Sequence, residues 1–429
     1  MECYLAQNCK LQRGYSNTAI YNFNTKEVYL INHKSGDALV QGSPLPHTLV
    51  EKLKLKDILT TRRTEQEHSP FVFDYNLFDD KYSFEKCKLA YLEVTDVCNY
   101  HCMHCYANVQ RLADSYMSKD DVAYYIDQIR SLGPCDIRIT GGEPFLNKNI
   151  RSIIEIVDGR ILPVTQHSIV SNGSFNISDA LFALSKGFEI QISIYGVNRE
   201  KFCAFSNASA TAYDKVIENL KQLSESKYRE QIRLLFSVNA LTFDDINAFI
   251  ALANFLGFRY ILNRPASVGR AVENWEMLRL PLDKLTEFAK SQRAKQPFYC
   301  YHLCQLHWIS IMVNGDVTPC GFLRNRKYVL GNLKIDSFDS IWHSCAYNAF
   351  RALTANDVTK CKDCEFKYIC TAGCCGETAA YTGNILNPFS HCQIRPYENL
   401  DYLSITDDQI YHIIKNAAGL FEFEEVKVV

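Results

Sequence analysis

The chain has 429 residues, a length that predicts two or three domains. Lysine and arginine total 46 and aspartate and glutamate total 48, so the formal net charge is −2. This balance argues against a nucleic-acid-binding protein, which would carry a basic excess or a basic stripe. The 18 cysteines form about 4% of the chain, too few for a small disulfide scaffold and too many for packing alone.

The first residues show no basic segment followed by an apolar one, so they do not resemble a signal peptide. No apolar run approaches the roughly 18 residues that would span a bilayer. We therefore expect a cytoplasmic protein with neither membrane nor nucleic acid among its partners. Because disulfides are rare in the cytosol, the cysteines are interpreted first as metal ligands.

The first predicted segment covers residues 1–86. Residues 19–23 and 27–31 are short apolar runs separated by Asn24, Thr25 and Lys26, which predicts a hairpin. Helical patterns follow near residues 34–39 and 47–53. The polar stretch 60–81 is interpreted as a linker.

From residue 87 to 264, β-like runs alternate with amphipathic stretches. Strands are predicted at 89–94, 137–140, 168–171, 190–194, 232–238 and 260–262, and helices at 120–132, 149–157, 213–223 and 244–255. Gly133, Gly187 and Gly257 stand at predicted helix ends. Six βα units in series predict an α/β fold with parallel strands, a partial (β/α)6 barrel whose chemistry lies at the carboxyl ends of its strands.

Two motifs follow predicted strands in this region. Cys98, Cys102 and Cys105 come after the first strand, and three thiolates can hold three irons of a 4Fe–4S cluster while the fourth iron stays open. A structural zinc site that recruits His101 or His104 is the alternative. The second motif, residues 141–144 (Gly-Gly-Glu-Pro), follows the second strand, where glycines allow a close backbone approach and a carboxylate can accept hydrogen bonds from an ammonium.

The pair of motifs resembles the radical S-adenosylmethionine (SAM) superfamily over residues 88–264. The resemblance implies an oxidoreductase whose catalytic 4Fe–4S cluster is bound by Cys98, Cys102 and Cys105. The methionyl amine and carboxylate of SAM would chelate the open iron, and reductive cleavage would give a 5′-deoxyadenosyl radical that abstracts a hydrogen atom. The cofactor-binding residues implied are Gly141, Gly142, Glu143 and Pro144 for the methionyl end, His104 near adenine, and Ser171 and Ser193 on the third and fourth strands.

The C-terminal cysteines resemble the SPASM extension of radical enzymes over residues 300–395. That resemblance implies two auxiliary 4Fe–4S clusters, three clusters in all, although two zinc ribbons are an alternative. One auxiliary cluster would be bound by Cys361, Cys364, Cys370 and Cys392. The other would be bound by Cys304, Cys320 and Cys374, with Cys300 expected to close it. Cys375 is expected to be a spare neighbour, and Cys3, Cys9, Cys87, Cys135, Cys203 and Cys345 to be buried small side chains.

SPASM enzymes act mostly on peptides, and two branches of the family are considered. The sulfatase-maturating branch carries a proton-accepting Asp directly after the cysteine equivalent to Cys320, where this chain has Gly321. Residues 1–55 resemble the small winged-helix element with which ribosomal-peptide (RiPP) maturases capture a leader peptide as an added strand. A merely stabilising N-terminal extension is the alternative.

The predicted domains are a leader-recognition-like domain with linker (1–86), the partial barrel (87–264), a bridge (265–299), the SPASM domain (300–395) and a tail (396–429). The sequence predicts a peptide maturase that installs a thioether or carbon–carbon crosslink, or less readily inverts a stereocentre. Its partners would be a precursor peptide, with leader and core, and an electron donor such as flavodoxin or ferredoxin. A formylglycine-forming sulfatase maturase is the alternative, and a non-enzymatic iron–sulfur electron carrier a remote one.

Overall fold

The computed structural model describes residues 4–15, 17–60, 70–78, 86–109, 115–160, 165–291, 300–304, 308–389, 392 and 427–428. The chain forms two compact units. Unit 1 combines residues 1–83, 282–305 and 351–429, and unit 2 combines residues 84–281 and 306–350. These units group the chain differently from the predicted domain ranges, because the end of the cysteine-rich segment shares a unit with the N-terminal residues.

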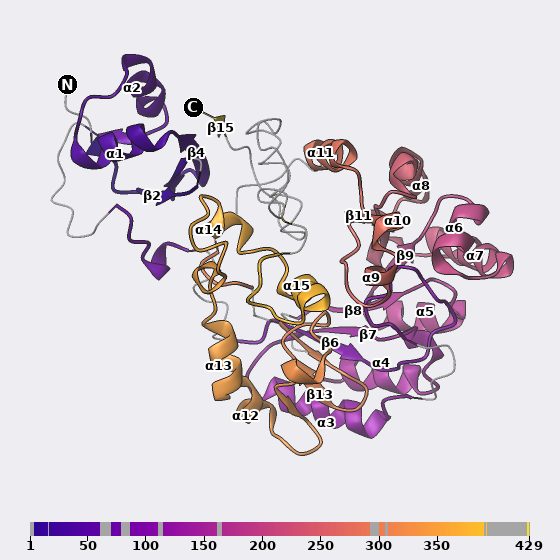
Figure 1. Ribbon diagram of the computed structural model, residues 1–429. Coiled ribbons are helices and arrows are strands. Elements are labelled where there is room, and N and C mark those ends of the chain that lie inside the picture. The colour runs from indigo at the N-terminus through magenta and orange to yellow at the C-terminus, as the bar shows by residue number, and fades with distance from the viewer. Residues whose placement is uncertain are drawn as a thin grey trace. The chain divides into compact units, whose positions relative to one another are not determined.

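A nine-stranded sheet forms the centre of unit 2 (Figure 1). Six strands run parallel in reverse chain order: β11 (Arg259–Asn263), β10 (Ile232–Ser237), β9 (Glu189–Ile194), β8 (His167–Ser171), β7 (Asp136–Thr140) and β6 (Leu89–Glu93). The six predicted strands and their parallel arrangement are confirmed. Their carboxyl ends therefore lie at one edge, where the cysteine loop and the Gly-Gly-Glu-Pro segment both begin.

Helices follow these strands, as the alternating pattern predicts. They are α3 (Lys119–Arg130), α4 (Ile150–Asp158), α5 (Ile177–Ser185), α6 (Arg199–Ser206), α7 (Ala210–Glu225) and α8 (Ile246–Leu256), followed by the short α9 (Arg270–Glu273) and α10 (Trp275–Leu278). Helix α4 buries Ile150, Ile153, Ile154 and Val157, the spacing of one helix face. Helices α3, α4 and α5 lie side by side along the sheet (Figure 1). The helix end expected at Gly187 is confirmed by α5, although the span of α5 was not predicted, and α6 was not predicted at all.

The sheet of unit 2 extends beyond the predicted barrel. Strand β12 (Trp308–Ile311) pairs in parallel with β6, and β13 (Asp316–Thr318) and β14 (Gly331–Asn332) continue the sheet in antiparallel order. Helices α12 (Phe338–Trp342) and α13 (Cys345–Arg351) follow. Residues from the predicted SPASM range thus complete the same sheet that positions the cysteine loop.

Unit 1 contains an antiparallel meander of β2 (Cys9–Arg13), β3 (Thr18–Asn22) and β4 (Glu27–Ile31). Helices α1 (His33–Gln41) and α2 (His47–Lys54) follow, and β1 (Tyr4–Leu5) pairs with β5 (Leu59–Thr60). The predicted hairpin and both helices are confirmed, whereas β2 was missed. A winged-helix identity for this segment stays a prediction. The remaining elements of unit 1 are α11 (Leu282–Ser291), α14 (Lys367–Cys370), α15 (Cys375–Thr382) and β15 (Lys427–Val428), which pairs with β4.

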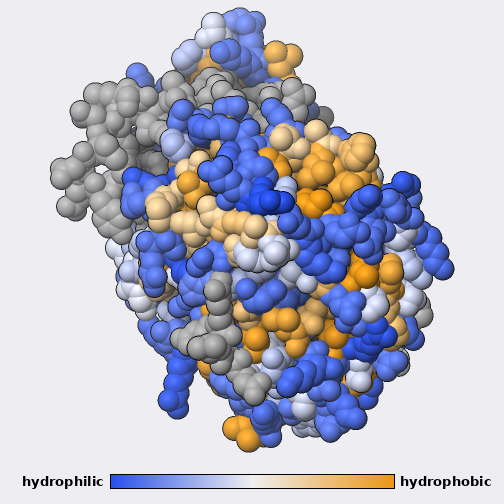
Figure 2. Space-filling view, turned by 90° about the vertical axis from the view of Figure 1, so that its right-hand side faces the viewer, coloured by the Kyte–Doolittle hydropathy of each residue, from blue (hydrophilic) through white to orange (hydrophobic). Residues whose placement is uncertain are grey.

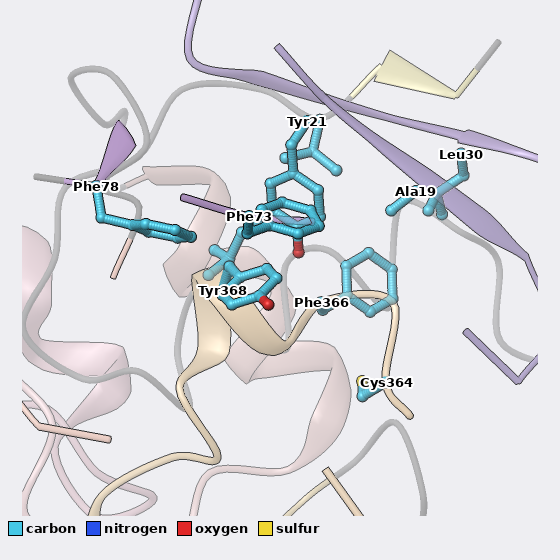
Figure 3. Close-up of a cluster of buried hydrophobic side chains, with 10 residues drawn as sticks. Ala19, Tyr21, Leu30, Phe73, Phe78, Cys364, Phe366 and Tyr368 are labelled. Atoms are coloured by element: carbon cyan, nitrogen blue, oxygen red, sulfur yellow. The ribbon is translucent and has the colours of Figure 1, made fainter. Parts of the chain in front are cut away.

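An aromatic core joins distant parts of unit 1 (Figure 3). Tyr21 from β3 meets Phe73 edge to face, with ring centroids 5.6 Å apart, and Phe73 lies 4.3 Å from Tyr368. The Tyr21 hydroxyl donates a 2.7 Å hydrogen bond to the carbonyl of Glu365. Phe73 and Phe78 are buried in this core, so the interpretation of residues 60–81 as a linker is wrong where the structure describes them.

Hydrophilic areas alternate with apolar patches on the face shown in Figure 2. None of the helices in the described ranges combines the length and the hydropathy that a bilayer crossing requires. The predicted cytoplasmic location stays a prediction.

Candidate functional site

The cysteine loop of unit 2, residues 94–109, carries Cys98, Cys102 and Cys105 at the carboxyl end of β6. Helix α6 supports it, because the backbone N–H groups of His101 and Met103 donate 3.0 Å hydrogen bonds to the carbonyls of Ser206 and Phe205. Inside the loop, the N–H of Cys105 donates to the carbonyl of Cys102 over 3.2 Å. These hydrogen bonds fix the backbone that carries the three thiols.

The three predicted ligands lie close enough to influence one another. Burial, with smaller contributions from the charges of Glu143 and Cys105, raises the pKa of Cys98 to about 12. Burial also raises the pKa of the Cys102 thiol, with added contributions from Cys98 and Cys105. Metal binding removes such protons, because thiolates are the ligating form. Three convergent thiols fit a cluster held by three cysteines.

A single-ion site is a poorer fit for these residues. Among the described residues, no group of three or more His, Cys, Asp or Glu side chains is spaced for one metal ion. A 4Fe–4S cluster instead distributes its cysteine ligands over separate irons. His104, which a zinc site could have recruited, stacks on the Phe205 ring with centroids 4.8 Å apart. The arrangement favours cluster ligation over the zinc alternative.

The Gly-Gly-Glu-Pro segment is joined to the cysteine loop through its backbone. The N–H groups of Gly142 and Glu143 donate to the carbonyls of Thr95 and Val97 over 2.7 and 2.8 Å. A Cβ atom at Gly141, where φ is 132°, would lie 2.3 Å from the Thr95 carbonyl oxygen, and one at Gly142 would lie 2.1 Å from that of Val97. The glycines therefore allow a close approach of this segment to the cysteine loop itself.

The Glu143 carboxylate accepts three hydrogen bonds from its own chain. It accepts from the Ser171 hydroxyl (2.8 Å), the Asn172 N–H (2.7 Å) and the Phe145 N–H (3.2 Å). Burial raises its pKa to about 7, although these donors oppose the change. The structure thus brings together Glu143 and Ser171, two of the predicted cofactor-binding residues. Contact of Glu143 with an ammonium stays a prediction.

A second group of thiols lies in unit 1. Burial raises the pKa of the Cys370 thiol, and Cys392, Cys361 and Cys364 contribute to the same direction. The other three cysteines predicted to share this auxiliary cluster therefore lie near enough to Cys370 for their charges to act on its thiol. Their convergence fits a cluster closed by four protein ligands.

The predicted ligands of the other auxiliary cluster belong to both units. Cys300, Cys304 and Cys374 are in unit 1, and Cys320 is in unit 2. Cys375, expected to be a spare neighbour, contributes a thiol that hydrogen-bonds with Cys304 and lies buried at the start of α15. The role of Cys300 stays a prediction.

Two family models match the chain. The model described as the radical SAM superfamily matches residues 92–253, and that of the SPASM iron-sulfur cluster-binding domain matches residues 300–365. The chain is a radical SAM enzyme with a SPASM domain. Its predicted fold class is confirmed in the partial barrel and the SPASM segment.

Relatives of this radical SAM enzyme include an AdoMet-dependent heme synthase of Methanosarcina barkeri, 23% identical over 72% of this chain and 97% of that protein. A probable GTP 3′,8-cyclase of Saccharolobus solfataricus is 30% identical over 40% of this chain and 54% of its own length. Similar solved structures include Streptococcus suis SuiB bound to S-adenosylmethionine (TM-score 0.54, 14% identity, 90% of this chain and 98% of that chain). Another is anSMEcpe with bound AdoMet and the Cp18Cys peptide (TM-score 0.56, 17% identity, 78% and 100%).

The remaining predicted site residues occupy defined places in the radical SAM unit. His104 is half-buried, and desolvation of its ring lowers its pKa to about 4, which keeps the ring neutral. Pro144 begins a short 3-10 helix, Pro144–Leu146. Ser193, near the end of β9, hydrogen-bonds with Tyr195, which also hydrogen-bonds with Cys102. Tyr195 was not singled out in the sequence, although it stands two residues after Ser193.

The ion pair between Glu93 and Arg324, near the cysteine loop, was also not predicted from the sequence. Glu93, the last residue of β6, accepts hydrogen bonds from the Arg324 guanidinium and from the Ser310 hydroxyl, the latter over 3.3 Å. Burial raises the pKa of Glu93, and Arg324 opposes this change. Arg324 also lies 3.7 Å from Asp96. This pair ties the loop after Cys320 to the strand that leads into the cysteine loop.

The cysteines without a predicted metal role differ in exposure. Cys9, Cys87 and Cys135 are buried, as expected, and the Sγ atoms of Cys87 and Cys135 lie 3.5 Å apart. Cys203 is only partly buried and Cys345 is exposed, so the expectation of burial is wrong for these two. Cys3 lies outside the described residues.

Proposed function

We propose that this radical SAM enzyme is a peptide maturase with three 4Fe–4S clusters. The observation that carries the proposal is the convergence of Cys98, Cys102 and Cys105 beside the Gly-Gly-Glu-Pro segment. This donor set leaves one iron for an outside ligand. Bound there, SAM supplies a 5′-deoxyadenosyl radical that abstracts a hydrogen atom from the peptide. The peptide then gains a thioether or carbon–carbon crosslink, or undergoes epimerisation.

The chain's own residues would prepare this site. Residues 141–144 hold the cysteine loop through two backbone hydrogen bonds and would hold the methionyl end of SAM. Glu143 fixes Ser171 and Asn172 at the end of β8, so that three neighbouring strand ends keep one geometry. Such fixed placement is what hydrogen abstraction needs, because the reacting atoms must meet in a near-attack arrangement.

A peptide substrate is supported by the similar structures. SuiB has been solved with the precursor peptide SuiA (TM-score 0.54) and anSMEcpe with the Cp18Cys peptide (TM-score 0.56). The β2–β4 meander of unit 1 is the proposed leader-binding element, since an extended peptide can add to a sheet edge. Flavodoxin or ferredoxin is the proposed electron donor, and the cytoplasm the proposed compartment.

Formylglycine formation, as in sulfatase maturation, is the second candidate, because anSMEcpe is among the similar structures. Position 321 disfavours it. A Cβ atom at Gly321 would lie 3.3 Å from Cε2 of Tyr106, so an aspartate there would press against that ring. Position 321 therefore offers no side chain that could accept a proton as that aspartate does.

Anaerobic incubation with SAM, a reductant and candidate precursor peptides, followed by mass spectrometry, tests the proposal. Loss of two hydrogen atoms indicates a crosslink, and incorporation of one solvent deuterium in D2O without another change indicates epimerisation. Replacement of sulfur by oxygen with loss of two hydrogens indicates formylglycine from cysteine. Formylglycine would favour the second candidate, and 5′-deoxyadenosine production unaffected by every peptide would contradict a peptide substrate.

A further inference from the structure

Residues 269–274, which match no sequence motif, form hydrogen bonds with the cysteine loop. Arg270, the first residue of α9, donates from Nη1 to the carbonyl of Cys102 and from Nη2 to that of Val109, each over 2.9 Å. Its backbone N–H donates to the carbonyl of Cys105 over 3.0 Å. One residue therefore holds three carbonyls of the loop, two of them belonging to predicted cluster ligands.

The approach of α9 to the loop depends on the preceding glycine. Gly269 has φ of 57°, and a Cβ atom there would lie 2.4 Å from the carbonyl oxygen of Tyr106 and 2.5 Å from that of Cys105. One turn later, Nδ2 of Asn274 donates to the carbonyl of Met103 over 3.1 Å. The segment 269–274 is shaped to fit the backbone of the cysteine loop.

The charge of Arg270 is left uncompensated by these contacts. Arg270 is only 7% exposed, and within the described part of the chain its guanidinium donates these two hydrogen bonds to neutral carbonyls. A buried charge without a counter-charge is costly. Its positive charge opposes the burial-driven rise in the pKa of the Cys102 thiol, so its field reaches that thiol. Thiolates holding a cluster would place negative charge close to this guanidinium.

We infer that Arg270 is a positioning residue for the catalytic cluster. It fixes the loop carbonyls at Cys102, Cys105 and Val109, and its charge raises the reduction potential of the cluster, because net charge and hydrogen bonding set that potential. This inference rests on the proposed ligation by Cys98, Cys102 and Cys105. A further feature makes it testable: a polar hollow of about 530 Å³ borders Arg270, so a shorter side chain can be hydrated rather than leave a dry cavity.

The test compares R270Q, R270K and N274A in the full-length, reconstituted enzyme. N274A is the matched control, because it removes a neutral contact to the same loop from the same face. The readouts are potentiometric EPR titration of the SAM-responsive cluster and the rate at which a chelator removes its iron. R270Q is expected to shift the potential to more negative values and to accelerate iron loss. N274A is expected to leave the potential unchanged.

R270K separates charge from geometry. Lysine keeps the charge but cannot span both carbonyls, so we expect R270K to have a reduction potential near that of the wild type and to lose iron faster. If R270Q does not fold, the rate of iron loss from R270K tests the inference. Unchanged potential and iron retention in R270Q, or unchanged retention in R270K, would overturn the inference. A wild-type enzyme without a SAM-responsive cluster would instead overturn the proposed function and the inference with it.

Discussion

The two cysteine groups are held in different ways. In unit 2, three thiols stand on a loop that depends on partners from elsewhere in the chain, among them Gly142 and Arg270. In unit 1, Cys361, Cys364 and Cys370 lie in one segment that turns through Thr371 and Ala372 at φ of 51° and 61°, and Cys392 joins them. Under the proposed ligation, the first group leaves one iron for a ligand and the second closes its cluster with protein.

Removal of the first group gives the largest expected effect. The variant C98A/C102A/C105A should lose 5′-deoxyadenosine production completely, because no other described thiol group beside the Gly-Gly-Glu-Pro segment could hold the cluster. It should retain the iron–sulfur absorbance of the auxiliary clusters. The exposed Cys345 offers the control, and C345A should behave as wild type. Production of 5′-deoxyadenosine by the triple variant would refute the assignment of the catalytic group.

Comparing Gly141→Ala with Gly133→Ala should separate the effect of steric contact on the unfolding free energy from that of backbone strain. Gly133→Ala is the matched control, since Gly133 has φ of 111° but nothing within 4 Å of its added Cβ. The control should lose about 1–2 kcal/mol of unfolding free energy from the backbone alone. G141A should lose about 1–3 kcal/mol more through overpacking against Thr95, and bind less iron after reconstitution. Denaturant unfolding and iron analysis measure both, and equal losses would contradict the predicted contact.

Glu143 should make the stability of the metal-free chain depend on pH. Its pKa is raised by burial from an ordinary 4.5 to about 7. The folded state therefore holds the proton more tightly, and the stability contributed by protonation is present below about pH 4.5 and lost as pH rises to about 7. That loss should be at most about 3 kcal/mol and should be absent in E143Q. Denaturant unfolding across this window checks it; the same slope in E143Q would exclude Glu143 as the cause.

Tyr21→Phe should have the smallest effect of these changes. It should lower the stability of unit 1, which contains the second thiol group. The change removes the 2.7 Å hydrogen bond to the Glu365 carbonyl but keeps the ring. A buried acceptor without its donor costs about 1–3 kcal/mol. Unfolding of unit 1 should occur at lower denaturant, while 5′-deoxyadenosine production by unit 2 stays unchanged. Y15F is the exposed counterpart, because Tyr15 lies in the turn between β2 and β3, is 49% exposed and donates a solvent-exposed 3.4 Å hydrogen bond to the Lys360 carbonyl. Its loss should cost less than that of the buried Tyr21 bond.

Sequence reasoning located the elements whose signal is local. The parallel strands and most helices follow from periodicity, and both motifs follow from spacing. Strand β12 was missed because four residues pairing with β6 carry no period of their own. Arg270 and the Glu93–Arg324 pair were missed for a related reason. The sequence does not show what a single charged residue will contact. Arg270 lies 168 positions from Cys102, and Arg324 lies 231 positions from Glu93, so only the fold brings each pair together.

The aromatic core of unit 1 has a consequence for the order of folding. Strand β3 cannot complete its packing until the segment 364–369 has been synthesised, and the hydrogen bond between Tyr21 and Glu365 spans 344 positions. Contacts of such separation form late, because loop closure costs entropy before any contact repays it. Cys364 belongs to that core and, under the proposed ligation, also to an auxiliary cluster. If iron binds there, the N-terminal sheet should finish folding when iron enters the second thiol group, which would couple metal supply to the maturation of the first-made residues.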